Sequence, residues 1–238
     1  MKHYGIIGNP LGHSYSEGYF TDKFVREGID ACYTPYELSS ITSVVDLLAR
    51  LDGFNVTYPF KEAIIPLLHD IDPIALHIGA VNVVHHGKGY NTDWIGFSDS
   101  LRPLLAANDQ RALLLGTGGV SKAIQYALRT MGIDYTLVSR SSCPAMGVLG
   151  YDQLTDSVIA SHTLIINCTP LGMHPLSQHK PTIDYNALTP RHLLYDCIYN
   201  PAKTPFLLEG VARHCRIKNG LEMLHLQANE AWKIWNEL

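Results

Sequence analysis

The feature that most constrains the fold is a glycine-rich turn between a short apolar run and a segment of helical spacing. Residues 112–115 are the apolar run, Gly116 to Gly119 make the turn, and residues 120–131 carry the helical pattern. Where a strand leads into a helix in this way, backbone N–H groups and the positive helix end can meet a pyrophosphate. Glycine allows the approach because no Cβ stands in the way. The candidate cofactor ligands here are Gly116, Gly118, Gly119 and Val120.

Two departures from the usual dinucleotide pattern bear on this turn. Ser121 stands where a third glycine is common, so a tight strand-to-helix turn without a ligand is the alternative. About twenty residues on, an NAD enzyme places an acidic side chain against the ribose, whereas this chain has Ser139, Arg140 and Ser141. An arginine fork beside two hydroxyls suits a 2'-phosphate, so the sequence predicts NADP. A solvated loop arginine is the alternative.

Short apolar, β-branched runs alternate with longer segments of helical period along the chain. This alternation is typical of βα units around a mostly parallel sheet, so we predict an α/β fold. In the first half the predicted strands are 4–8, 33–38, 54–57 and 81–84, and the predicted helices are 19–27, 44–51, 61–69 and 74–78. In the second half the predicted strands are 112–115, 135–138, 164–167 and 193–196.

The chain divides near its middle. A hairpin tip at residues 85–89 precedes a predicted helix at 94–107, which leaves the first domain. The last apolar residues, from Leu221 to Leu238, form one helical stripe that must be buried, and we expect this helix to return to the first domain. The predicted domains are a substrate-binding α/β domain, 1–97 with 219–238, and a Rossmann-like dinucleotide-binding domain, 98–218.

Composition excludes several classes of partner. The 238 residues carry a net charge of -4, without a run of five or six like charges, so a nucleic-acid partner is not expected. No apolar stretch approaches the roughly 18 residues that span a bilayer, and the N-terminal residues resemble a strand rather than a leader. We therefore expect a soluble, cytoplasmic protein with no membrane partner.

Cysteine and histidine do not indicate a metal site. The five cysteines are an odd number without a Cys-x-x-Cys pair, which is typical of reduced structural thiols. Of twelve histidines, His85 and His86 are adjacent, but they lie in a glycine-flanked turn without a carboxylate pair. We expect no metal.

A set of polar side chains in the first half suggests a site for a small acid. Asn55 and Thr57 lie two residues apart, on one face of a predicted strand, and Lys61 follows one helical turn beyond. With Asp93 they supply an amide, a hydroxyl, an ammonium and a carboxylate, which can hold a polyhydroxylated acid and move one proton. Lys61 lies at a helix start, where the dipole disfavours a cation, which suggests another reason for a lysine at this position.

Eight short motifs follow one another along nearly the whole chain. They are Gly8-x-Pro10-x-x-His13-Ser14-x-Ser16, Asn55-Val56-Thr57-x-Pro59-x-Lys61, Gly79-Ala80-Val81-Asn82, Gly89-x-Asn91-Thr92-Asp93-x-x-Gly96, the Gly116 turn, Asn167-x-Thr169-Pro170-Leu171-Gly172-Met173, Tyr195-Asp196-x-x-Tyr199-Asn200-Pro201, and Gly220 with Gln227. In this order they resemble the shikimate dehydrogenase family. The resemblance implies NADP-dependent, reversible reduction of 3-dehydroshikimate to shikimate, in aromatic amino acid biosynthesis.

The resemblance also implies residue roles. Lys61 and Asp93 would be the catalytic pair. The implied substrate ligands are Ser14, Ser16 and Tyr199 for the carboxylate, and Asn55, Thr57, Asn82, Asp93 and Gln227 for the ring hydroxyls. The implied residues on the nicotinamide side are Asn167, Thr169 and Met173, with Gly220 at the return to the first domain. The two serines taken alone are equally consistent with helix capping.

Four positions depart from the family pattern. Glu17 stands where proline is usual, Tyr19-Phe20 replaces a later His-Asn pair, and Val83 replaces a common threonine. Pointing inward, Glu17 would weaken the binding of an acid. The chain is also short for the family, and its oligomeric state is expected to be monomer or homodimer.

Three other functions remain alternatives. A binding or regulatory module would need no proton pair, which Lys61 and Asp93 supply. A quinate/shikimate dehydrogenase with broader substrate and cofactor use is a nearer alternative, which Arg140 does not favour. A methylenetetrahydrofolate dehydrogenase-like enzyme shares a two-domain plan but does not explain Ser14, Ser16 and Gln227 together.

Overall fold

The computed structural model describes residues 1–12 and 15–237, the side chain of Glu237 excepted. Two compact units make up the chain. Unit 1 comprises Met1–Asp93 with Gln227–Leu238, and unit 2 comprises Trp94–Leu226. The predicted domain limits, 1–97 with 219–238 and 98–218, stay a prediction.

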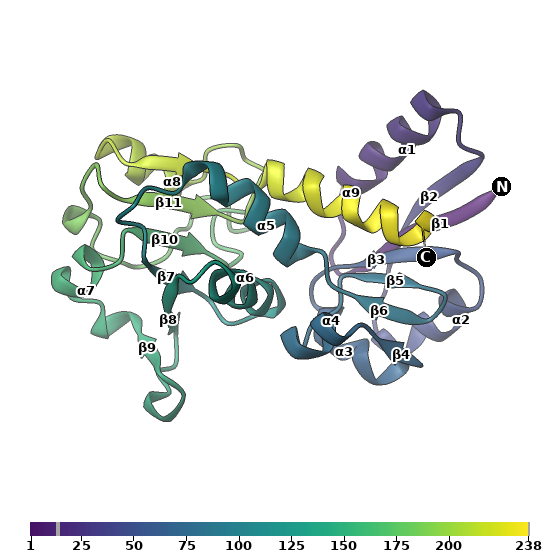
Figure 1. Ribbon diagram of the computed structural model, residues 1–238, viewed down its shortest axis with the longest axis horizontal. Coiled ribbons are helices and arrows are strands. Elements are labelled where there is room, and N and C mark those ends of the chain that lie inside the picture. The colour runs from purple at the N-terminus through teal and green to yellow at the C-terminus, as the bar shows by residue number, and fades with distance from the viewer. Residues whose placement is uncertain (13–14, 238) are drawn as a thin grey trace. The chain divides into compact units, whose positions relative to one another are not determined.

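The described part of unit 1 contains a six-stranded sheet with the order β2-β1-β3-β5-β6-β4 (Figure 1). Its strands are β1 (Lys2–Gly8), β2 (Ala31–Glu37), β3 (Gly53–Val56), β4 (Asp70–Ile71), β5 (Val83–His85) and β6 (Lys88–Tyr90). β1 runs parallel to both β2 and β3. β5 is antiparallel to β3 and pairs with β6, which confirms the predicted hairpin.

Each face of this sheet carries its own apolar core, because successive strand residues point to opposite sides. Phe54 and Val56 of β3 face one core, and Tyr4 of β1 faces the other. The helices are α1 (Tyr15–Glu27), α2 (Val45–Leu48), α3 (Phe60–Ala63) and α4 (Pro73–Ile78), with 3₁₀ turns at Ile41–Val44 and Ile65–Leu67. The helix predicted over 61–69 is therefore shorter and broken, because Pro66 has no N–H for a helical bond.

Two helices contain the unit boundary, α5 (Asp93–Leu101) and α9 (Leu221–Glu237). Trp235 of α9 stacks on Tyr4 with 4.8 Å between ring centroids, and its indole N–H donates to Val84 O at 3.1 Å. The predicted return of the last helix to the first half of the chain is thus confirmed. α5 ends before the predicted residue 107, since Pro103 falls in a 3₁₀ turn at Arg102–Leu104.

Within its described residues, unit 2 has a six-stranded parallel sheet with the order β12-β11-β10-β7-β8-β9 (Figure 1). The strands are β7 (Arg111–Leu115), β8 (Asp134–Ser139), β9 (Val148–Gly150), β10 (Leu164–Asn167), β11 (Leu193–Asp196) and β12 (Arg216–Lys218). The helices are α6 (Gly119–Thr130), α7 (Asp156–Ala160) and α8 (Pro205–Ala212), with 3₁₀ turns at Pro144–Met146, Tyr151–Gln153 and Tyr185–Ala187. The order reverses between β7 and β10, the switch point of a Rossmann-like sheet, where ligands bind at the carboxyl ends of the strands.

The β7 sequence explains why this sheet is covered on both faces. Ala112 and Leu114 pack into one core, while Leu113 and Leu115 pack into the other. A continuous apolar run is what a parallel strand buried on both faces requires. None of the helices in the described residues combines the length and the apolar character that a membrane span needs.

Candidate active site

The centre of the polar cluster in unit 1 is an ion pair between Lys61 and Asp93. Lys61 Nζ lies 2.6 Å from Asp93 Oδ2, and the two side chains are 17% and 7% exposed. Lys61 is the second residue of α3, and Asp93 begins α5, where a carboxylate faces the positive helix end. The ion pair with Asp93 gives a reason for a lysine at this helix start.

Asn82 holds Asp93 from the other side. Its Nδ2 donates to Asp93 Oδ1 at 3.0 Å, to Thr92 Oγ1 at 3.0 Å and to Gln227 Oε1 at 3.2 Å. Its Oδ1 accepts from the Thr92 N–H at 2.7 Å. Both amide N–H groups therefore have acceptors within unit 1, so this arrangement makes Asn82 a support for the carboxylate.

The loop before α5 is fixed by its own polar groups. Asn91 Oδ1 accepts from the Asp93 N–H at 3.1 Å, and Asn91 Nδ2 donates to Ala80 O at 2.8 Å. Thr92 Oγ1 donates to Gln227 O at 3.0 Å, which ties the loop to α9. These contacts explain why Asn91 and Thr92 are buried although both are polar.

The other predicted substrate ligands in unit 1 are placed as follows. Asn55 is buried on β3 and donates from Nδ2 to Asn82 O at 3.3 Å. Thr57 is half-buried just after β3, and Ser16 is buried in α1. Glu17 is exposed. Ser14 lies outside the described residues.

Direct hydrogen bonds therefore bring together five of the predicted site residues, namely Lys61, Asp93, Asn82, Asn55 and Gln227. Tyr199 belongs to unit 2, in the loop after β11, and is half-buried. Gly220 is buried directly before α9, and a Cβ there would collide with the Cys197 carbonyl. The roles of all these residues stay predictions.

The glycine turn of unit 2 lies at the switch point. Gly116 has φ +112°, and a Cβ there would lie 3.1 Å from Thr169 Cγ2 and 3.2 Å from the Cys168 carbonyl carbon. Gly118 precedes α6 with open space where a Cβ would be, and Gly119 and Val120 begin the helix. A pyrophosphate fits such a turn, because the first N–H groups of a helix have no intrahelical acceptor.

The predicted 2'-phosphate residues follow β8. Ser139 ends the strand, and its Oγ accepts from the Ser141 N–H at 3.4 Å. Arg140 and Ser141 are exposed, and within the described residues Arg140 makes no hydrogen bond or ion pair. A solvated guanidinium next to two hydroxyls can receive a phosphate without first breaking a protein contact.

The predicted nicotinamide-side residues follow β10. Asn167 Oδ1 accepts from the Thr169 N–H at 3.0 Å and from Thr169 Oγ1 at 2.7 Å. Asn167 Nδ2 donates to Leu171 O and to Asp196 Oδ1, both at 3.1 Å. Met173, farther along the same loop, is exposed. These hydrogen bonds fix the shape of the loop at the carboxyl ends of the parallel strands, where a ligand would bind.

A buried carboxylate anchors this loop; it belongs to one of the family motifs, but the sequence assigned it no role. Asp196 ends β11; besides Asn167, its Oδ1 accepts from the Ile198 N–H at 3.0 Å, and its Oδ2 accepts from Thr204 Oγ1 at 2.6 Å. Burial raises the pKa of Asp196 from its ordinary 3.8 to about 6, against the opposing effect of its hydrogen bonds. Asp196 therefore links the loops after β10 and β11 to the start of α8.

The high pKa of Asp196 predicts a specific pH dependence of stability. The folded protein binds this proton more tightly than the unfolded chain, so the unfolding free energy falls as pH rises from about 4 to about 6. Asp196→Asn keeps the side-chain oxygen and cannot titrate. We expect its stability relative to the parent to increase by about 2 kcal/mol between pH 4 and 7.

Urea unfolding of both proteins at pH 4, 5, 6 and 7 measures this difference. Subtracting the unfolding free energy of the parent from that of the variant cancels the contribution of titrating groups that both proteins share. His162 is one such group, since burial lowers its pKa. A difference in stability that is the same at every pH would contradict the assignment.

Comparisons with known proteins identify the family of this chain. The family model described as the shikimate dehydrogenase substrate binding domain matches residues 6–84. Shikimate dehydrogenase (NADP(+)) from Bacillus cereus (strain ATCC 10987 / NRS 248) is 36% identical, over 98% of this chain and 91% of the relative. This chain belongs to the shikimate dehydrogenase family.

Solved structures of the family have the same fold. Shikimate dehydrogenase from Aquifex aeolicus superposes with a TM-score of 0.88 at 33% identity, covering 100% of this chain and 93% of that one. The Thermus thermophilus enzyme, crystallised with NADP(H) and shikimate, gives 0.88 at 27% identity, covering 100% and 94%. The α/β fold with a Rossmann-like second half is thus confirmed.

Two buried hydroxyl groups in this member of the shikimate dehydrogenase family were not predicted from its sequence. The Tyr33 hydroxyl donates to Asn55, and the Thr204 hydroxyl donates to Asp196. Thr204 precedes Pro205 at a helix start, a recognisable capping signal, whereas Tyr33 carries no signal beyond its strand position. Among the described residues, no group of three or more His, Cys, Asp or Glu side chains could hold a metal ion.

Proposed function

We propose that this chain is an NADP-dependent shikimate dehydrogenase that reversibly reduces 3-dehydroshikimate to shikimate. The observation that carries the proposal is the 2.6 Å contact between Lys61 Nζ and Asp93 Oδ2 in a mostly buried polar cluster. A binding module has no need of such a pair. The similarity over nearly the whole chain to the NADP-dependent shikimate dehydrogenase from Bacillus cereus also supports the proposal.

We assign substrate recognition to residues of unit 1 and to Tyr199 of unit 2. Ser14, Ser16 and Tyr199 would bind the carboxylate of the substrate. Asn55, Thr57, Asn82, Asp93 and Gln227 would contact its hydroxyls. In support, Asn55 retains one amide N–H without a partner among the described residues. The exposed position of Glu17 removes the expected interference with acid binding.

The proton chemistry follows from the ion pair. NADPH, when bound, supplies the hydride. Lys61 would donate a proton to the carbonyl oxygen of the substrate as negative charge develops there, and would accept it back in the reverse reaction. Asp93 holds the ammonium in place through Oδ2, while Asn82 holds Oδ1. The Asp93 carboxylate thus orients the Lys61 ammonium, and the Asn82 amide orients the carboxylate.

The cofactor is assigned to unit 2. Gly116, Gly118, Gly119 and Val120 would receive the pyrophosphate, and Ser139, Arg140 and Ser141 would receive the 2'-phosphate. Asn167, Thr169 and Met173 would lie on the nicotinamide side, with Gly220 at the start of the returning helix. The fit is supported by the positive φ of Gly116 and by the open space above Gly118.

A cofactor and substrate matrix tests the proposal. The purified chain is assayed at 340 nm with shikimate or quinate against NADP or NAD. We expect shikimate with NADP to give the highest kcat/KM. Comparable turnover of quinate or NAD would indicate a broader quinate/shikimate dehydrogenase. Absence of turnover with every pair would contradict the proposed function.

We further propose that the enzyme acts in the cytoplasm as a monomer or homodimer, without a nucleic-acid partner. The net charge of -4 disfavours binding to a polyanion. Size-exclusion chromatography with light scattering tests the oligomeric state, and a larger assembly would contradict it.

A further inference from the structure

We propose that Tyr33 is a positioning residue that fixes the side-chain amide of Asn55, so that Asn55 offers an N–H donor to the substrate. This inference rests on the proposed function. It assigns a role to a residue outside the family motifs, and it specifies the chemistry that Asn55 presents, namely a donor for a substrate oxygen.

The register of the sheet brings the two side chains to the same face. Tyr33 pairs with Tyr4 across β2 and β1, and Asn55 pairs with Ile6 across β3 and β1. Tyr4, Ile6 and Tyr33 belong to one core, while Phe54 and Val56, on either side of Asn55, belong to the opposite core. Asn55 therefore points to the Tyr33 side of the sheet.

A tyrosine is long enough to reach across the intervening strand. Neighbouring strands lie roughly 4.8 Å apart, so β2 and β3 are separated by about twice that distance. The Tyr33 hydroxyl donates to Asn55 Oδ1 at 2.7 Å. Shorter polar side chains on β2 would not cover this span.

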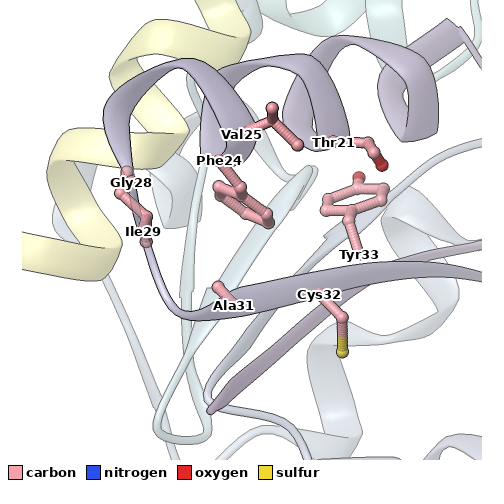
Figure 2. Close-up of a pocket in the computed structure, with 8 residues that line it drawn as sticks. All are labelled: Thr21, Phe24, Val25, Gly28, Ile29, Ala31, Cys32 and Tyr33. Carbon is pink, nitrogen blue, oxygen red and sulfur yellow. The ribbon is translucent and has the colours of Figure 1, made fainter.

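The phenol ring is held rigidly. Tyr33 is 5% exposed and stacks on Phe20 of α1 with 4.7 Å between ring centroids and 16° between planes. Figure 2 shows Tyr33 pointing from β2 toward α1, beside Thr21, while the neighbouring Cys32 points the other way. This close-up shows a pocket between α1 and β2, and Tyr33 forms one side of it.

The hydroxyl of Tyr33 also contacts a predicted carboxylate ligand. Burial raises the pKa of Tyr33 well above its ordinary 10.0, although a hydrogen bond from Ser16 lowers it. The phenol thus stays protonated and remains a donor to Asn55.

These bonds determine which end of the Asn55 amide is which. Oδ1 accepts from Tyr33, and one N–H of Nδ2 donates to Asn82 O at 3.3 Å. Rotation of the amide by half a turn would set its oxygen against the Asn82 carbonyl, which loses that bond, and would take Oδ1 away from the Tyr33 O–H that donates to it. The second N–H is left for a ligand acceptor.

The test is a double-mutant cycle on steady-state kinetics with Tyr33→Phe, Asn55→Ala and the double variant. Tyr33→Phe should raise the KM for shikimate about fivefold, with kcat and the KM for NADP within about twofold. In the Asn55→Ala background the same substitution should have almost no effect, because its target is already gone. Asn55→Ser replaces Asn55→Ala in the cycle should the latter not fold.

Tyr36→Phe is the matched control. Tyr36 lies on the same strand, is half-buried, and its hydroxyl makes no hydrogen bond with any described residue. Its KM values should equal those of the parent. Additive effects of Tyr33→Phe and Asn55→Ala on the KM for shikimate would overturn the inference, and so would an unchanged KM in Tyr33→Phe. In either case, turnover by the parent would still support the proposed function. A parent without turnover would instead contradict the proposed function itself.

Discussion

Replacing Lys61 by alanine is expected to lower kcat for shikimate oxidation at least about a hundredfold while changing the KM for shikimate little. General acid–base catalysis by a positioned side chain contributes about 10²- to 10⁴-fold, or roughly 3 to 5 kcal/mol. The contact of the ammonium strengthens as charge develops on the substrate oxygen, so its loss raises the barrier more than it weakens binding. Steady-state kinetics at saturating NADP measures both constants.

The chain offers a matched control for this variant. Lys88 Nζ lies 2.9 Å from Asp70 Oδ2, so it forms a lysine–aspartate pair in the same unit, but these side chains are 34% and 55% exposed. Lys88→Ala should retain the kcat of the parent. An unchanged kcat in Lys61→Ala, or an equal loss in both variants, would remove Lys61 from the proposed chemistry.

Loss of Lys61 also leaves Asp93 buried without its cation, although the Asn82 amide still donates to it. Removal of one partner of a buried pair destabilises the fold. Unfolding in urea, measured on the same protein, therefore separates a loss of catalysis from a loss of folded enzyme. A folded, inactive variant is the expected result.

The sequence predicts those parts of the fold whose pattern is local. The β7 run and the glycine turn after it are correct, because an apolar strand followed by glycine and a helical period has few other solutions. β9 and β12 were not predicted, since each has three residues at a sheet edge and is defined by pairing with a distant strand. α8 is apolar almost all round, so no stripe marks it.

For the site, the sequence predicts residue types better than their connections. Lys61 and Asp93 are 32 positions apart, and only the packed structure brings them together. Asn82 is predicted as a ligand through the resemblance, yet its amide is occupied by Asp93, Thr92 and Gln227. Tyr33 was missed because an aromatic residue in a strand is ordinary core material, and its hydroxyl partner lies two strands away.

Replacing Arg140 by alanine is expected to raise the KM for NADP by about ten- to a hundredfold while leaving the kinetics with NAD nearly unchanged. A hydrogen bond to a charged group contributes roughly 1.5 to 3 kcal/mol, and NAD has no 2'-phosphate to receive it. Arg140 is exposed and makes no hydrogen bond or ion pair within the described chain, so its removal should cost little stability. Kinetics with both cofactors at saturating shikimate measure the effect.

Arg129 is the matched control for Arg140, since it is also an exposed arginine of unit 2, on the last turn of α6 with its guanidinium over the Tyr135 ring. Arg129→Ala should leave the ratio of kcat/KM for NADP and NAD unchanged. Arg140→Ala should reduce that ratio by about the same factor by which the KM for NADP rises, because only one of the two cofactors loses a contact. Equal losses with NADP and NAD would place Arg140 on a part common to both cofactors and contradict the 2'-phosphate assignment.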